Sequence, residues 1–541
     1  MNKGQLTITY PFIRRIALVY ISLPLFCFFI GWLKWYFALV SCLALILSLI
    51  FSEDINLINR FIHKKDHSEN SNAPDVSNTE DKKIVVSKPL LISVALFALV
   101  YSILCGVGRL WAQSSDYPWR NAIFRDLIVK NWPVLYDSFE GALSYYIGLW
   151  LPAAIPGKLV YLLSGNAETA FFAGNMVFLA YYTFGMIILF LLLILHYKIS
   201  SFKRIYLVLL GFVFFSGMDI LSPWPITYHL HLEWWTGIYQ FSSITTCMCW
   251  VFNQALISWI SMSLLLNEKK VSSYVLIGMA CLFNGPFPFV GYFVFCISIA
   301  IKRLVEMIKA QSIKTYLKEI LSIPNVCSVC FVFPFIGTYL LSNNAIGASS
   351  GEGKLMSVLT WNASDIFVYV IFVMLEFGIY AVLIAKDNYR NYLFYVSVLL
   401  LLICPMIHIG SNADFTMRAS IPPIFMMFVF CYQFILDELS RRKEKSIEHT
   451  QSKSVRSISF SGLLCLVLVA SLVIGAVTPC VEFARGFEQI YLRGINDPKT
   501  DSIITLDRDK NPIDENEYWP PANFIASNMD DKIFFKYFAR V

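Results

Sequence analysis

Met186-Ile187-Ile188-Leu189-Phe190-Leu191-Leu192-Leu193-Ile194-Leu195 is an unbroken apolar run. A helix needs about 20 apolar residues to cross roughly 30 Å of hydrocarbon, and runs of about this length recur along most of the chain. A transmembrane β-strand would instead alternate apolar and polar side chains over about ten residues. The run therefore predicts a membrane-spanning helix, and its recurrence predicts an all-α polytopic membrane protein.

The composition of the 541 residues excludes an ordinary soluble domain. Hydrophobic residues make up 57% of the chain and charged residues only 15%, whereas a soluble domain carries about 25% charged residues. The net charge of +6 does not indicate nucleic acid as a partner, because in a membrane protein the placement of Lys and Arg mainly sets topology. Most cysteines lie in apolar runs, where a thiol behaves as a small hydrophobe, so no disulfide framework is predicted.

The apolar runs predict about thirteen spans, at residues 12–32, 35–51, 89–108, 171–195, 205–222, 246–266, 272–284, 287–301, 326–342, 364–385, 391–408, 419–437 and 458–478. If the N-terminus is cytoplasmic, the cytoplasmic loops hold most of the Lys and Arg. This distribution predicts a multi-pass protein of the plasma (inner) membrane, with a cytoplasmic N-terminus and an extracytoplasmic C-terminus.

The predicted spans divide the chain into four parts. These are two N-terminal transmembrane helices (1–51), a cytoplasmic linker whose polar composition predicts disorder (52–88), a transmembrane core (89–478) and an extracytoplasmic C-terminal segment (479–541). The first outer loop, 109–170, is long enough for helices beside the membrane. Pro118 favours a helix start, and Phe124, Leu127 and Ile128 form an apolar stripe that predicts a helix on the membrane surface.

Residues 272–301 are barely long enough for two crossings between their Lys-rich edges. The Asn284-Gly285-Pro286 break predicts the turn between them. Short membrane helices are tolerated where they line a cavity, so this turn either faces an outer vestibule or is a simple tight turn. On the cytoplasmic side, residues 302–325 are basic with apolar residues at helical spacing, which predicts an amphipathic helix on the anionic leaflet.

Part of the first outer loop carries a family resemblance. Asp116 followed by Arg125-Asp126-Leu127 resembles the first outer loop of GT-C superfamily polytopic membrane glycosyltransferases, in the lipid A aminoarabinose transferase and protein O-mannosyltransferase-like branch. Tyr117 stands where that superfamily usually has a second acidic residue. The Asn284-Gly285-Pro286 break resembles the Lys-Gly-Pro break of the branch, and Met417-Arg418 resembles its Arg-aromatic start of a late span.

The resemblance implies a GT-C glycosyltransferase fold with outer-face juxtamembrane helices. It also implies transfer of a sugar from a polyprenyl-phosphate-sugar donor to a lipid-linked or glycan acceptor of the cell envelope. The polyprenyl phosphate leaves as a stable anion, whereas the acceptor hydroxyl needs a base. We predict Asp116 as this base and Asp126 as the second candidate. The alternatives are a helix cap for Asp116, and for Asp126 an ion pair with Arg125 or Lys130.

The leaving phosphate needs charge-assisted hydrogen bonds, and Arg418 lies in a suitably polar outer loop. Its alternatives are a pair with Asp414 or extension to lipid headgroups. The other predicted substrate-binding residues are Arg120, Arg125, His229, His231, Glu233, Trp234, Tyr239, His408 and Asn412. A divalent cation, Mg²⁺ or Mn²⁺, fits at His229, His231 and Glu233 if the chain is extended there. An aromatic belt at the membrane interface is the favoured alternative, so no metal ligand is assigned.

Two other function classes stay open. One is a lipid or polysaccharide transporter or flippase, which needs a polar path to both faces, and the other is a non-catalytic subunit of envelope assembly. Glu376 and the amides Asn253 and Gln254 lie within predicted spans, where polar side chains usually face a partner or a cavity. Glu376 has no matching ladder of ionisable residues in neighbouring spans, which argues against a proton-coupled transporter.

The C-terminal segment 479–541 is the last region with a distinct pattern. Tyr518-Trp519-Pro520-Pro521 and the terminal run Ile533 to Phe538 are too aromatic to stay in water. The segment is short for an independent domain, so we predict that it packs against the outer loops near Asp116 and covers the acceptor entrance. The alternative is that the terminal aromatics insert into the lipid interface.

Overall fold

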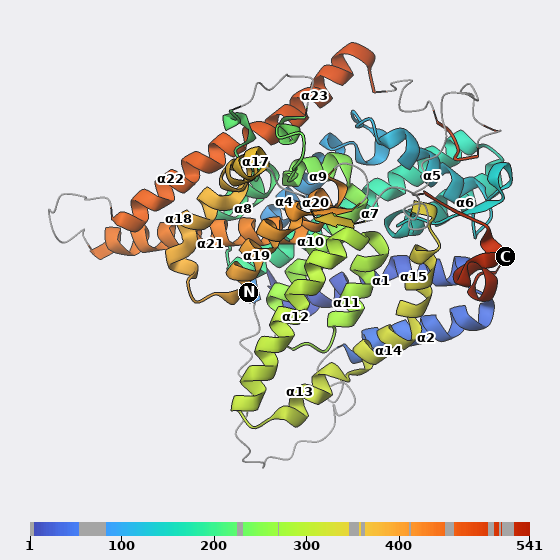
Figure 1. Cartoon of the computed structure of the whole chain (residues 1–541), viewed down its shortest axis with the longest axis horizontal. Coiled ribbons are helices and arrows are strands. Elements are labelled where there is room, and N and C mark those ends of the chain that lie inside the picture. Colours follow the sequence, from blue (N-terminus) through green and yellow to red (C-terminus); the bar gives the residue numbers. More distant parts are fainter. Residues whose placement is uncertain are drawn as a thin grey trace.

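The computed structural model describes residues 5–52, 83–223, 231–268, 270–345, 356–358, 363–409, 413–448, 459–495, 503–507, 510 and 524–540. The architecture is mostly helical (Figure 1). Seven helical stretches in these ranges are long and apolar enough to cross a membrane, namely Tyr10–Trp32, Ala167–Tyr197, Pro286–Lys309, Ile323–Leu341, Asp365–Asn388, Ile421–Glu444 and Phe460–Arg493. The chain therefore has the long apolar helices of a multi-pass membrane protein.

The helices are α1 (Tyr10–Trp32), α2 (Trp35–Phe51), α4 (Lys88–Leu104), α5 (Tyr117–Val129), α6 (Leu151–Ser164), α7 (Ala167–Tyr197), α8 (Phe202–Phe214), α9 (Ile244–Trp250), α10 (Phe252–Asn267), α11 (Tyr274–Asn284), α12 (Pro286–Lys309), α13 (Ile313–Ile320), α14 (Ile323–Phe331), α15 (Phe333–Leu341), α17 (Ala363–Val373), α18 (Ile379–Asn388), α19 (Tyr392–Ile403), α20 (Asp414–Ala419), α21 (Ile421–Glu448), α22 (Phe460–Gly475) and α23 (Val477–Arg493). Each predicted span overlaps at least one of them. Several are short, for example α11 with 11 residues, so the count of thirteen spans stays a prediction.

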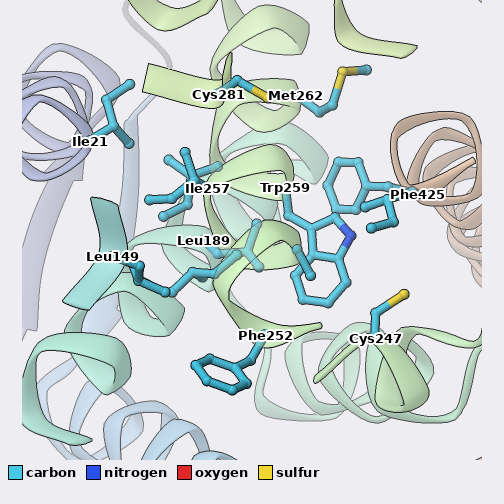
Figure 2. Close-up of a cluster of buried hydrophobic side chains, with 14 of the residues drawn as sticks. Ile21, Leu149, Leu189, Cys247, Phe252, Ile257, Trp259, Met262, Cys281 and Phe425 are labelled. Carbon is cyan, nitrogen blue, oxygen red and sulfur yellow. The ribbon is translucent and has the colours of Figure 1, made fainter. Parts of the chain in front are cut away.

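The centre of the protein is α10. It packs against α1, α7, α11, α12 and α21, and nearly all of its residues are buried. Figure 2 shows Trp259 of α10 in the cluster that also holds Ile21, Leu189, Cys281 and Phe425 from four of these neighbours. Its buried residues include polar side chains such as Asn253, Gln254 and Ser258 as well as apolar ones.

The two N-terminal helices belong to the same hydrophobic core as the rest of the chain. α1 packs on α7 and α11, and α2 packs on α14. The end of the predicted disordered linker is a strand, since β2 (Lys83–Ser87) pairs antiparallel with β1 (Gln5–Thr9). The prediction of disorder is wrong for residues 83–87, where Ile84 and Val86 alternate with exposed residues and are buried. Residues 53–82 lie outside the described part.

Two further small sheets modify the all-α prediction. β3 (Leu135–Tyr136), β4 (Gly141–Leu143) and β7 (Ile525–Ser527) form one sheet, and β5 (Met356–Val358) pairs with β6 (Ile407–Ile409). Because β7 comes from the C-terminal segment and β3 and β4 from the first outer loop, this sheet fastens the two regions together.

The predicted turn at Gly285 is confirmed, because α11 ends at Asn284 and α12 begins at Pro286. The amphipathic region 302–325 is divided between the end of α12, the separate helix α13 and the start of α14. The chain turns at Gln311, whose φ is 51°. α13 keeps Ile313 and Leu317 exposed beside its lysines, as the amphipathic pattern predicts.

α5 forms where the first outer loop predicts a helix. It packs against α6 and α7, and Phe124 contacts Phe171 and Phe178 of α7 with ring centroids 6.0 and 5.7 Å apart. The apolar stripe is covered by protein, which buries Leu127 and Ile128 completely, and the position of α5 relative to the membrane stays a prediction.

The C-terminal segment packs against the rest of the protein, as predicted. Phe534 is fully buried, with its ring 5.8 Å from Phe28 and 5.2 Å from Tyr339. Insertion into lipid is therefore wrong for Phe534. α23 continues from α22 along one long edge of the molecule (Figure 1). The aromatic segment 518–521 lies outside the described residues.

Candidate functional site

Asp116 lies directly before α5, at the position that caps a helix. Its carboxylate makes no capping hydrogen bond, so the capping alternative is wrong. The side chain is 48% exposed, and Oδ2 accepts a hydrogen bond of 3.0 Å from Nη2 of Arg120 one turn later. Asp116 is therefore an accessible carboxylate held beside a cation.

Arg120 is buried, unlike its partner Asp116. Its guanidinium carbon lies 5.7 Å from the ring centroid of Phe252 and 5.9 Å from that of Tyr117. Nη1 is buried and has no hydrogen-bond partner among the described residues. A buried cationic N–H group without a partner is costly, so this group is suited to an anionic ligand.

Arg418 lies on α20 and is also nearly buried, with 14% of its side chain exposed. Nη1 lies 2.6 Å from Oδ1 of Asp414, so the predicted Asp414 pair is confirmed and extension to lipid headgroups is wrong. Nε is buried and without a hydrogen-bond partner in the described part of the chain. Arg418 thus has a second donor left over after its ion pair is made.

Tyr145 is a residue that both arginines influence electrostatically. It lies within electrostatic range of both Arg120 and Arg418, and Arg418 also faces Tyr146. The two tyrosine rings are 3.6 Å apart, and Tyr145 is buried. The sequence analysis did not select these tyrosines, although a Tyr-Tyr pair in a long outer loop was the available signal.

His231 and Glu233 belong to the same short segment but face different partners. Nδ1 of His231 lies 3.0 Å from Nη1 of Arg485 on α23, whereas Oε1 of Glu233 accepts a hydrogen bond of 2.8 Å from the Ser243 backbone N–H. The extended chain that a shared metal would need is replaced by a short 3₁₀ turn, Leu232–Trp234. Among the described residues no group of three His, Cys, Asp or Glu side chains is arranged to hold a metal ion.

α23 brings further polar groups toward Asp116. Glu482 accepts a hydrogen bond of 3.0 Å from the indole N–H of Trp250, and the ring of His231 lies 4.5 Å from that of Trp250. His231 is within electrostatic range of Asp116. Burial lowers the pKa of His231, and the nearby Arg485 acts in the same direction. Both effects favour the neutral imidazole, and Glu482 and Asp116 act in the opposite direction to a smaller extent.

Glu233, Asp219 and Glu376 form a second polar group. All three are buried and interact electrostatically. Burial, with a contribution from Asp219, raises the pKa of Glu233 to about 8. The sequence analysis found no ladder of ionisable residues for Glu376 in neighbouring spans. The acids near it are Asp219, at the end of the predicted span 205–222, and Glu233, in the polar segment that follows. A Cβ at Gly217 would meet Oε2 of Glu376 at 2.1 Å, so only glycine fits there.

The carboxylate of Asp126 is buried and held by hydrogen bonds within the protein. Its Oδ2 accepts hydrogen bonds from the Tyr136 hydroxyl at 3.0 Å and from the Leu506 backbone N–H at 2.9 Å. Burial raises its pKa to about 6. The nearby Arg125 lies over the ring of Phe171 at 4.1 Å and makes its recorded ion pair with Glu168 at 3.9 Å.

The other predicted substrate-binding residues lie in different surroundings. Tyr239 is buried against Phe372 and Tyr369 of α17, and Trp234 is half-buried in its 3₁₀ turn. His408 belongs to β6 and pairs with Ser357 of β5. His229 and Asn412 lie outside the described residues.

Comparisons with protein-family models, with curated proteins and with solved structures gave no match. The chemistry of the site therefore has to be argued from its own residues. They provide one accessible carboxylate, two guanidinium groups that each keep a buried unpaired donor, and Tyr145 within electrostatic range of both arginines. Such a set can bind a phosphate through the arginines while the carboxylate accepts a proton.

Proposed function

We propose that the protein is a membrane glycosyltransferase that moves a sugar from a polyprenyl phosphate to a lipid or glycan acceptor at the outer face. The observation that carries the proposal is that Arg120, paired with Asp116 at 3.0 Å, and Arg418 both lie within electrostatic range of Tyr145. Both guanidinium groups keep a buried donor without a partner in the described part of the chain. A phosphate between them would satisfy these donors with charge-assisted hydrogen bonds.

The reaction follows from the positions of these groups. A hydroxyl oxygen of the acceptor attacks the anomeric carbon of the sugar, and the bond from that carbon to the phosphate oxygen breaks. The phosphate leaves with the electron pair of that bond and remains an anion beside Arg120 and Arg418. Asp116 takes the hydroxyl proton. One displacement of this kind inverts the anomeric centre.

Asp116 suits the role of base better than Asp126. Its carboxylate is half-exposed and accessible to an acceptor, whereas the Asp126 carboxylate is buried and already accepts two hydrogen bonds. We assign Asp116 as the base on these grounds.

The proposal includes the finer arrangement of the membrane part. Thirteen spans of GT-C type would place the first outer loop, α20 and the C-terminal segment on one side, which is the outside if the N-terminus is cytoplasmic. Two contacts support this common side: β7 pairs with β4, and Arg485 of α23 lies against His231. Segments in contact outside the spans must lie on the same side of the membrane. The plasma membrane is the proposed location.

The test is turnover of a radiolabelled donor by the purified, reconstituted protein. Undecaprenyl phosphate carrying labelled mannose, glucose or arabinose is supplied with a total lipid and glycan extract as acceptor. Transfer of label into an acceptor fraction, with release of undecaprenyl phosphate, supports the proposal. Label that crosses the vesicle membrane without transfer identifies a flippase instead, and would overturn the proposal.

A further inference from the structure

Three carboxamide side chains lie in the interior near the start of α10 and the turn between α11 and α12. Asn253 and Asn284 are fully buried and Gln254 is 2% exposed. Both amide atoms of Asn253 and of Gln254, and Oδ1 of Asn284, have no hydrogen-bond partner among the described residues. Only Nδ2 of Asn284 is satisfied, by the Ala280 carbonyl at 2.8 Å.

Burying five amide atoms without partners opposes folding, since each costs about 1 to 3 kcal/mol. Other buried amides of this protein are satisfied. Nδ2 of Asn267, at the other end of α10, donates to the Ser263 carbonyl at 2.7 Å, and Asn325 donates to the Val271 carbonyl at 2.9 Å. Among the described residues, the unsatisfied amides therefore lie at the start of α10 and the end of α11, next to the proposed phosphate site.

Close backbone approaches keep Gln254 and Asn284 near one another at the turn. A Cβ at Gly285 would lie 3.1 Å from Cβ of Gln254, and a Cβ at Gly148 would lie 2.6 Å from Oδ1 of Asn284. The turn therefore packs on α10 on one side and on the first outer loop on the other. Glycine is needed at position 148, because any side chain there would displace the Asn284 amide.

The amides lie between the elements that carry the two arginines. Phe252, two residues before Gln254, is the residue whose ring faces Arg120 at 5.7 Å. Figure 2 shows Phe252 at this end of α10, with Leu149 of the first outer loop nearby. On the other side, Phe287 of α12 contacts Phe415 of the Arg418 helix, with ring centroids 5.5 Å apart.

We propose that Gln254 and Asn284, with Asn253 beside them, bind the hydroxyl groups of the sugar ring of a lipid-linked sugar phosphate. This proposal rests on the proposed function and adds the recognition of the sugar itself. A carboxamide offers two N–H donors and a carbonyl acceptor, which match a hydroxyl that both donates and accepts. Being neutral, it adds nothing comparable to the arginines for the phosphate, so the two subsites recognise different parts of one donor.

The test measures binding rather than turnover. Purified full-length protein in nanodiscs is titrated with undecaprenyl phosphate and with undecaprenyl phosphate carrying mannose, glucose, galactose or arabinose. Gln254→Met and Asn284→Leu remove the amide with little change in volume. Each should weaken the tightest-binding sugar lipid at least about tenfold while the affinity for undecaprenyl phosphate stays within twofold of wild type.

Two comparisons separate the sugar subsite from a structural role and from the phosphate site. Asn267→Leu is the matched control, because it removes a satisfied amide from the same helix; it should lower the thermal midpoint without affecting sugar discrimination. Gln254→Met should leave the midpoint of the lipid-free protein unchanged or raise it, since it removes two unpaired groups. Asn284→Leu also removes the hydrogen bond of Nδ2 to the Ala280 carbonyl, so it is judged by its sugar discrimination alone. Arg418→Ala should weaken both kinds of lipid equally.

The proposal is overturned if the two amide variants bind the sugar lipids as wild type does, or lose affinity for both kinds of lipid alike. It is also overturned if wild type binds no sugar lipid more tightly than undecaprenyl phosphate. In these cases, if Arg418→Ala still weakens binding of the lipids, the phosphate site is supported even though the sugar subsite is not. If wild type binds none of the lipids, the proposed function fails together with the sugar subsite.

Discussion

The carboxylate of Asp126 accepts a hydrogen bond from the backbone N–H of Leu506 at 2.9 Å, across 380 positions of sequence. Next to it, Nζ of Lys130 lies 2.9 Å from Oδ2 of Asp507. Both contacts attach the C-terminal segment to α5, the helix that positions Asp116 and Arg120. Asp126 belongs to the stretch that resembles a catalytic motif, but in this structure its carboxylate holds the C-terminal segment against α5.

Asp126→Ala should loosen the C-terminal segment. The change leaves the Leu506 N–H and the Tyr136 hydroxyl without their acceptor, at a cost of about 1 to 3 kcal/mol for each. We expect limited proteolysis to release the segment at least about tenfold faster. Asp126→Asn keeps an acceptor oxygen and should behave more like wild type in both proteolysis and transfer. Loss of transfer in Asp126→Asn with normal proteolysis would instead favour Asp126 as the base.

Asp116→Asn should retain folding and donor binding but lower transfer at least about a hundredfold, the usual contribution of a positioned base. Its ion pair with Arg120 is half-exposed, so its loss should change stability by less than about 1 kcal/mol. Asp137→Asn is the control, because Asp137 lies in the same outer loop and is 93% exposed. Transfer by Asp116→Asn within a few-fold of wild type would refute its role as base.

Arg418→Ala should weaken donor binding by about 1.5 to 3 kcal/mol, the range for a hydrogen bond to a charged group. The dependence of rate on donor concentration measures this effect. Arg441→Ala is the control: it removes an exposed arginine that pairs with Asp387 at 2.9 Å on the predicted cytoplasmic side. If Arg418→Ala leaves the concentration dependence unchanged, Arg418 does not bind the donor phosphate.

Apolar runs located the helices well, because crossing hydrocarbon restricts length and composition strongly. The same reasoning did not predict that α6 and α7 cover the apolar stripe of α5, since a stripe does not say whether lipid or protein lies against it. The grouping of Glu376 with Asp219 and Glu233 was also out of reach, because it depends on an outer segment folding down onto a distant helix. The position of Glu376 along its predicted span does not reveal that Asp219 and Glu233 lie near it.

The buried carboxyl of Glu233 should make stability depend on pH. Its pKa in the folded protein, about 8, is above its ordinary value near 4.3. The stabilisation is therefore complete below about pH 4 and is lost as the pH rises through about 8. We expect the free energy of unfolding in detergent to fall by about 2 kcal/mol between pH 6 and pH 9.

Glu233→Gln is the matched variant for this pH dependence. The amide oxygen can still accept the hydrogen bond from the Ser243 N–H, but it does not titrate. The variant should therefore show a smaller fall in stability over the same range. The neighbouring acids Asp219, Glu376 and Glu482 remain and account for any residual slope. An equally steep fall in Glu233→Gln would show that another group causes it.

Truncation after Glu515 tests whether the C-terminal segment covers the acceptor entrance. It removes β7, which pairs with β4 through Ala526 and Ala142, and the buried Phe534. We expect a protein that still inserts but transfers poorly, or chooses a different acceptor, when activity is normalised to folded protein.

Two point variants separate a role in covering the acceptor entrance from a role in general stability. Phe534→Ala should cost about 3 to 5 kcal/mol, whereas Tyr537→Ala, at a side chain 54% exposed, should cost little. If the truncated protein keeps full activity and unchanged acceptor preference, the segment stabilises the fold without taking part in acceptor selection.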